Sequence, residues 1–171
     1  MTRHSTPKIL LLGHTGQLGK VLKHLLTQAG TRVVTATRDG QGPAPSLDLA
    51  DAESIKRCVS SLRPDIVINA AAYTAVDQAE KEPQLAGTIN EDGPRTLALA
   101  LKDIGALLVH YSTDYVFDGS KDAPYTEDDP VNPLGVYGRT KRAGEVAVTE
   151  ANPDSLVLRT AWVYSPFGKN F

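Results

Sequence analysis

The segment 8–29 constrains the fold more than any other part of the chain. An apolar run, Lys8–Leu12, ends at Gly13, and the apolar residues of 18–29 then recur on one helical face. The first pattern is typical of a buried strand and the second of an amphipathic helix. A glycine-containing turn joins them, so the segment predicts a strand, a tight turn and a helix.

The same alternation continues to the end of the chain. Further strands are expected at 32–37, 47–49, 66–72, 106–111 and 155–163, and helices at 51–64, 83–104 and 137–149. Gly93 and Pro94 interrupt the second of these helices, which is therefore either kinked or two helices. The segment 39–46 has too many glycines and prolines for a helix and is expected to be a surface loop.

Apolar strands that alternate with helices predict an α/β fold, a doubly wound parallel sheet of the Rossmann type with helices on both faces. About six strands are expected, in the order 3-2-1-4-5-6, with a ligand crevice at their carboxyl ends beside the first strand. The length of 171 residues, 41% of them hydrophobic, suits one domain, which we assign to residues 6–171.

The charge of the chain narrows the class of partner. The formal net charge is −2, with 18 basic and 20 acidic residues spread along the sequence. This excludes a basic face for nucleic acid and a polybasic membrane anchor, and it favours small-molecule partners. The four apolar residues of 9–12 are too few for a secretory signal, so a cytoplasmic location is expected. Cys58 falls on an apolar helix stripe and is expected to be a core thiol.

The glycine-rich turn is the first candidate binding site. Its expected cofactor-binding residues are Gly13, Gly16, Gln17, Leu18 and Gly19. Backbone N–H groups and the positive end of the following helix attract a pyrophosphate, and glycines permit the close approach. The spacing is GxxGxxG rather than GxGxxG, and a purely structural turn stays open as the alternative.

The residues after the second strand bear on the choice of nicotinamide cofactor. An acid at this position favours the free 2′-hydroxyl of NAD, and an arginine favours the 2′-phosphate of NADP. The sequence offers both, as Arg38 and Asp39. We favour NADPH because the planar fork of Arg38 suits a phosphate, and NADH stays open.

Tyr137 and Lys141 form a YxxxK pair, and the i, i+4 spacing puts both side chains on one face of a helix. A carbonyl that accepts hydride needs a proton, and a nearby cation makes a phenol a better donor by lowering its pKa. Ser112, Thr113 and Asp114 follow a buried strand, where a hydroxyl can donate to the substrate oxygen. These residues together predict hydride transfer to a carbonyl.

Five segments make a specific resemblance at this point. The chain resembles the dTDP-4-dehydrorhamnose reductase family in HTGQLG, NAAAYTAVDQAE, HYSTDYVFDG, YGRTKRAGE and RTAWVYSPFGKNF, which occur in order. The resemblance implies an extended short-chain dehydrogenase/reductase that reduces the 4-keto group of dTDP-4-dehydro-L-rhamnose to give dTDP-L-rhamnose, a precursor of cell-surface polysaccharide.

The resemblance also implies roles for individual residues. Thr113, Tyr137 and Lys141 match the catalytic hydroxyl, the proton donor and the lysine that lowers its pKa. The other matches are Gly16, Gln17 and Leu18 for the pyrophosphate, Asp48 and Leu49 for adenine, Ala72, Tyr73, Thr74 and Tyr111 for the nicotinamide half, and Asp114 and Trp162 for the sugar. Asn69 and Asn90 are more simply explained as bridges between backbone groups.

The chain departs from the family in length, because family members continue into a second region that supplies most of the nucleotide-sugar pocket and the last strand. The final strand should therefore be an unpaired edge with apolar surface. The alternative to a reductase is a truncated or regulatory NAD(P)-binding protein without turnover. No metal ligand is assigned to this chain; Mg²⁺ is suggested by the resemblance alone, and a homodimer stays open.

Overall fold

A computed structural model describes residues 6–40 and 44–167 of the chain. Gln41, Gly42 and Pro43 of the expected loop, and the last four residues of the expected domain and of its final motif, lie outside the described residues. The elements are β1 (Lys8–Leu12), α1 (Gln17–Gln28), β2 (Arg32–Thr35), α2 (Ala52–Leu62), β3 (Ile66–Asn69), α3 (Val76–Ala79), α4 (Pro83–Gly87), η1 (Thr88–Asp92), α5 (Gly93–Lys102), β4 (Leu107–Thr113), η2 (Asp114–Val116), α6 (Val136–Ala151) and β5 (Leu156–Thr160).

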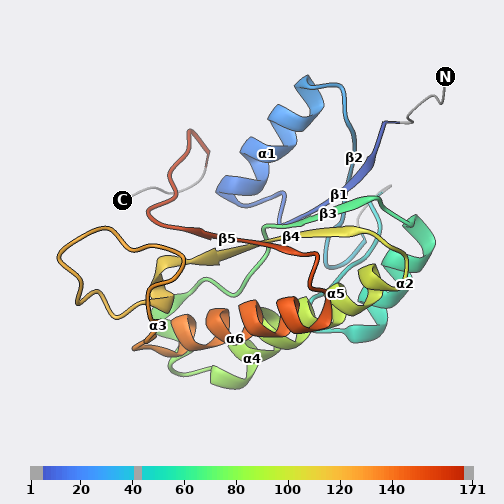
Figure 1. Cartoon of the computed structure of the whole chain (residues 1–171). Coiled ribbons are helices and arrows are strands. Elements are labelled where there is room, and N and C mark those ends of the chain that lie inside the picture. Colours follow the sequence, from blue (N-terminus) through green and yellow to red (C-terminus); the bar gives the residue numbers. More distant parts are fainter. Residues whose placement is uncertain (1–5, 41–43, 168–171) are drawn as a thin grey trace.

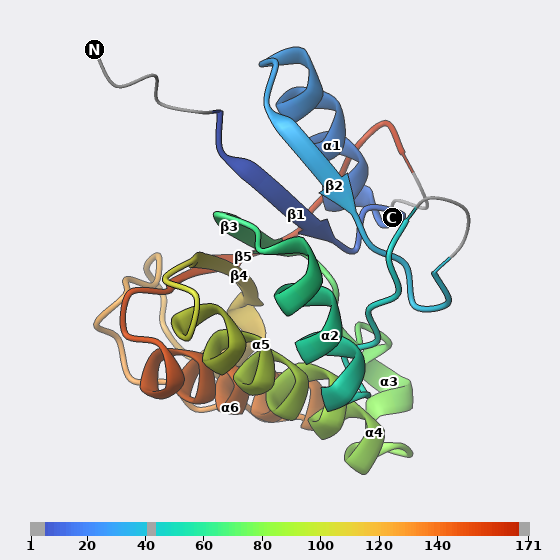
Figure 2. The same cartoon turned by 90° about the vertical axis from the view of Figure 1, so that its right-hand side faces the viewer.

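The sheet is parallel throughout and has the strand order β2-β1-β3-β4-β5 (Figure 1). Leu10 of β1 pairs with Val34 on one side and with Val67 on the other. Helix α1 covers one face, while α2, α5 and α6 cover the other (Figure 2). The doubly wound Rossmann fold predicted from the sequence is confirmed, and the order reverses beside β1, where ligands bind in such folds.

The expected number of strands was too high, because the described residues form five strands rather than about six. The segment 47–49 is not a strand. Thr37 and Ser46 form one isolated parallel bridge, after which the backbone N–H of Ala50 donates to the Asp48 carboxylate and the chain turns. Asp51 then caps α2 by accepting from two backbone N–H groups. The single bridge therefore lies just before the segment where a strand was expected.

The expected helix at 83–104 is interrupted, as Gly93 and Pro94 predicted. Helix α4 passes through the π-helical turn η1 into α5, which has Pro94 in its first turn. Proline has no N–H to donate, so the regular ladder of helix hydrogen bonds cannot continue through it.

A side chain at Gly144 of α6 would collide with the carbonyl of Asn90 in η1, so α6 and η1 pack backbone to backbone.

The core lies between the sheet and the three helices α2, α5 and α6. It includes Leu10, Val67, Leu97 and Leu108, all fully buried, together with Cys58. Burial raises the pKa of the Cys58 thiol to about 11, which keeps it protonated and agrees with the expected core role.

Strand β5 lies at the edge of the sheet among the described residues. Its Leu156 and Leu158 are 51% and 41% exposed. The prediction of an edge strand with apolar surface is confirmed. None of the helices in the described ranges is both long and apolar enough to cross a membrane.

Candidate functional site

The glycine-rich turn connects β1 to α1 at the carboxyl edge of the sheet. Gly13 has a φ of +74°, and a Cβ there would lie 2.6 Å from the Ala70 carbonyl carbon. A Cβ at Gly19 would collide with the carbonyl of Gly13, so the turn and the helix can close only with glycine at both positions. Gly16 is the N-cap of α1, and its backbone N–H donates to the Gly13 carbonyl over 3.0 Å. The turn therefore leaves no room for side chains at Gly13 and Gly19.

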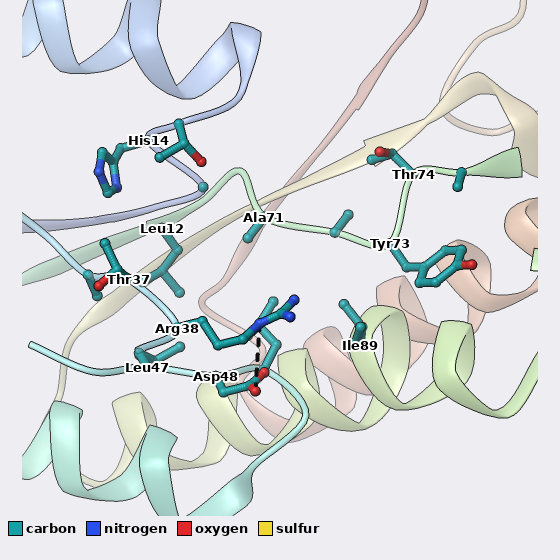
Figure 3. Close-up of a pocket in the computed structure, with 16 residues that line it drawn as sticks. Leu12, His14, Thr37, Arg38, Leu47, Asp48, Ala71, Tyr73, Thr74 and Ile89 are labelled. Atoms are coloured by element: carbon teal, nitrogen blue, oxygen red, sulfur yellow. Dashed lines mark ion pairs between the residues drawn. The ribbon is translucent and has the colours of Figure 1, made fainter. Parts of the chain in front are cut away.

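A first cavity, of about 460 Å³, lies between this turn and the segment that follows β2 (Figure 3). Its lining includes the expected cofactor residues Gly13, Arg38, Asp48, Leu49, Ala72, Tyr73 and Thr74. The guanidinium of Arg38 points toward the carboxylate of Asp48, with 3.7 Å between Nε and Oδ2 (Figure 3). Asp39, the acid next to Arg38 in the sequence, does not line this cavity. The acid at this site is therefore Asp48.

A second cavity, of about 420 Å³, lies on the other side of the loop that follows β3. It contains the remaining predicted residues: Gly16, Gln17, Leu18, Gly19, Tyr111, Thr113, Asp114, Tyr137, Lys141 and Trp162. Ala71, Ala72 and Thr74 line both cavities, so this loop forms a shared wall. Every residue predicted for cofactor, substrate or catalysis thus lines one of two adjoining cavities.

Thr113 ends β4, and its hydroxyl donates to the Asp114 carboxylate over 3.1 Å and accepts from the Tyr115 backbone N–H. Tyr137 lies in the first turn of α6, and its ring packs edge-on against that of Tyr115 at 5.5 Å. Burial raises the pKa of the Tyr137 phenol, and a hydrogen bond with Thr113 opposes that rise. The hydroxyl and the phenol are therefore neighbours, as the motif predicted.

Lys141 lies one helical turn after Tyr137 and is almost completely buried. Its ammonium donates to the carbonyl of Tyr111 over 2.7 Å, and burial lowers its pKa to about 8. The net shift of the Tyr137 pKa is upward, with burial as its largest cause, so the expected lowering by this lysine stays a prediction. The ammonium of Lys141 is directed at a backbone carbonyl.

One predicted residue lies apart from its expected neighbours. Tyr73 was expected beside Tyr111, but it lines the first cavity and donates from its hydroxyl to Glu82 over 2.6 Å. Trp162 lines the second cavity together with Asp114, as expected; its φ is +49° and the residue is 76% exposed.

Asn90 bridges backbone groups, as expected, whereas Asn69 links a backbone group to the ring of His110. Asn69 accepts from the backbone N–H of Ala71. Asn90 accepts from the N–H of Tyr73 over 2.8 Å, and its Nδ2 donates to the carbonyl of the same residue and to Thr140. The wall between the cavities is thus tied to η1 and α6.

Sequence reasoning missed other lining residues, among them Tyr115 and Thr160 in the second cavity. The position of Tyr115, two residues after Thr113, is a local signal that could have found it. Thr160 carries no such signal, because it reaches the cavity only through the pairing of β5 with β4. The described residues contain no group of three or more His, Cys, Asp or Glu side chains that could hold a metal ion.

Comparison with solved structures supports the fold in detail. A dTDP-4-dehydrorhamnose reductase from Bacillus anthracis in complex with NADP superposes with a TM-score of 0.90 at 38% identity, over 98% of this chain and 57% of that chain. The corresponding protein from Clostridium acetobutylicum gives a TM-score of 0.89 at 41% identity, over 96% and 56% of the two chains.

Comparison of sequences leads to the same family. The dTDP-4-dehydrorhamnose reductase of Streptomyces griseus is 47% identical over 172 residues, which is 100% of this chain and 55% of that protein. The chain thus spans about half the length of the curated relatives it matches. The resemblance seen in the five sequence segments is confirmed. A family model described as the RmlD substrate binding domain matches residues 7–171, and the chain belongs to that family.

Proposed function

We propose that this chain carries the cofactor-binding and proton-transfer part of an NADPH-dependent reductase that converts dTDP-4-dehydro-L-rhamnose to dTDP-L-rhamnose. The observation that carries the proposal is the second cavity, where Thr113, Tyr137 and Lys141 meet the glycine-rich turn. A hydroxyl, a phenol and an ammonium beside a phosphate-binding turn suit hydride transfer to a carbonyl. The names of the relatives supply the substrate class.

The chain's residues would divide the work between the two cavities. Arg38 and Asp48 face the adenosine half of the cofactor, and the N-terminus of α1 faces its pyrophosphate. Thr113 donates to the C4 oxygen of the sugar, and Tyr137 gives that oxygen its proton. When bound, NADPH supplies the hydride that C4 accepts, so the C=O bond becomes C–O–H. Lys141 holds α6 against β4 and contributes positive charge that favours the Tyr137 anion.

The proposal favours NADPH over NADH because Arg38 lines the first cavity and can bind a 2′-phosphate. A structural relative is bound to NADP. The proposed function includes no Mg²⁺, since the described residues offer no cluster of His, Cys, Asp or Glu side chains to hold one. A cytoplasmic location, where nucleotide sugars and NADPH occur together, belongs to the same proposal. A homodimer also belongs to this proposal, and sedimentation of the purified chain would measure its oligomeric state.

The test is oxidation of NADPH by the purified chain in the presence of dTDP-4-dehydro-L-rhamnose. We expect loss of NADPH absorbance that requires the keto-sugar. A dTDP-sugar with a hydroxyl at C4 is the matched control, because it has no carbonyl to accept hydride. NADPH binding without oxidation would contradict turnover and support an NAD(P)-binding protein without catalysis.

A further inference from the structure

Two backbone segments beside the first cavity are joined to each other. Thr37 pairs with Ser46 in the isolated parallel bridge, and the hydroxyl of Ser46 donates to the carbonyl of Arg38 over 2.7 Å. The backbone N–H of Leu47 also donates to the Thr37 carbonyl. These bonds fix the main chain of Arg38 relative to that of Asp48, so the two side chains start from a defined separation.

The two side chains of this ion pair differ in how firmly they are held. Asp48 accepts from the backbone N–H of Ala50 through Oδ1, and its own N–H donates to Ser54. Its side chain is 31% exposed, whereas that of Arg38 is 71% exposed. Asp48 therefore presents a fixed Oδ2 to the cavity, and Arg38 is the partner that can move.

We propose that Asp48 sets the cofactor preference by competing with the 2′-phosphate of NADPH for the guanidinium of Arg38. The inference deepens the proposed function and rests on it. To bind Arg38, a 2′-phosphate must break the ion pair between Arg38 and Asp48, and it must also approach the negatively charged carboxylate of Asp48. A free ribose hydroxyl, as in NADH, leaves the ion pair intact and can donate to Asp48. The pair therefore weakens NADPH binding relative to NADH binding and makes the cavity tolerant of both.

The neighbouring acid does not share this role. Asp39 is exposed and does not line the cavity, whereas Asp48 lines it beside Leu47 and Leu49. Removing either carboxylate changes the net charge equally. Asp39→Asn is consequently a matched control for Asp48→Asn.

The experiment measures dissociation constants of NADPH and NADH for the unsubstituted chain and for Asp48→Asn by fluorescence titration. Asparagine keeps an oxygen for the Ala50 N–H, so the turn before α2 is preserved. We expect the preference for NADPH over NADH to rise about fivefold or more, mostly through tighter NADPH binding. For Asp39→Asn the ratio should stay within about twofold.

A second variant separates competition from a merely structural effect. In an Arg38→Ala background, Asp48→Asn should change the ratio only about twofold, because only the direct repulsion of the phosphate remains. An unchanged ratio in Asp48→Asn, or an equal change in Asp39→Asn, would overturn the inference while leaving the proposed function intact. Failure of the unsubstituted chain to bind either cofactor would overturn both.

Discussion

The ammonium of Lys141 donates a 2.7 Å hydrogen bond to the main-chain carbonyl of Tyr111 and so joins α6 to β4. Tyr137 lies one turn earlier on the same helix, and Thr113 ends the same strand. One buried cation therefore ties together the two elements that carry the expected proton donor and the expected hydroxyl. Four predictions follow the consequences of this and of neighbouring contacts.

Lys141 should give the chain a specific dependence of stability on pH. Burial lowers its pKa from 10.5 to about 8, against a smaller opposing effect of Glu145. Between these values the folded chain binds fewer protons than the unfolded chain, so the free energy of unfolding rises with pH, by at most about 1.4 kcal/mol per pH unit. Below pH 8 and above pH 10.5 this contribution is flat.

The measurement compares urea unfolding of the unsubstituted chain with that of Lys141→Met from about pH 7.5 to about pH 9.5. The stability difference should move in favour of lysine as pH rises. Taking the difference cancels other alkaline titrations, such as that of Cys58. A difference that is constant, or that moves toward methionine, would contradict the assignment.

Tyr137→Phe should remove the proposed proton donor and keep the ring that packs against Tyr115. Loss of a positioned acid lowers turnover by about 10²- to 10⁴-fold. Cofactor affinity should change little, because the hydroxyl acts on the sugar oxygen. Steady-state turnover and NADPH titration of the same preparation check both statements, and full activity would show that Tyr137 is not the proton donor.

Gly19→Ala should disturb the glycine-rich turn, because the new methyl group would collide with the carbonyl of Gly13. Such overpacking lowers the free energy of unfolding by about 1 to 3 kcal/mol. The turn should also be displaced, which should weaken NADPH binding. Gly87→Ala is the control, since a Cβ there meets nothing within 4 Å and alanine favours a helix. Equal effects of the two substitutions on melting temperature and affinity would rule out this explanation.

Glu145→Gln should destabilise the chain through loss of a buried charge. Both carboxylate oxygens of Glu145 accept from Arg159 at 2.8 Å, and Arg142 donates to one of them. The side chains of Arg142 and Arg159 are 36% and 23% exposed, so we expect a loss of about 2 to 3 kcal/mol, less than for a fully buried pair.

Glu53→Gln, which breaks an exposed pair with Lys56, is the matched control and should cost less than about 1 kcal/mol. Urea denaturation measures both values. The prediction fails if the cost at Glu145 is no larger than the cost at Glu53.

The sequence predicted what depends on local patterns. Lys8–Leu12 and the turn at Gly13 were recognisable because a buried strand and a glycine turn leave their marks within a few residues. The same holds for Cys58, whose place on an apolar helix stripe predicted a buried thiol. Periodicity failed at 47–49, where apolar residues pack in the core without forming a strand.

Contacts between distant segments could not be predicted in this way. The carbonyl of Tyr111 accepts a hydrogen bond from Lys141, which is 30 residues away in the sequence. Glu145 of α6 binds Arg159 only because β5 lies beside this helix in the fold. Spacing placed Tyr137 and Lys141 on one helix face, but the direction of the ammonium depended on a strand whose position the pattern did not specify.

The shared wall formed by Ala71, Ala72 and Thr74 separates the cavity that contains Arg38 from the cavity that contains Tyr137. Arg38 lines only the first cavity and Tyr137 only the second. Under the proposed function, we therefore expect that substitutions at Arg38 can change the preferred dinucleotide without touching the residues proposed for proton transfer. Cofactor preference would then be open to evolution, or to engineering, separately from the chemical step.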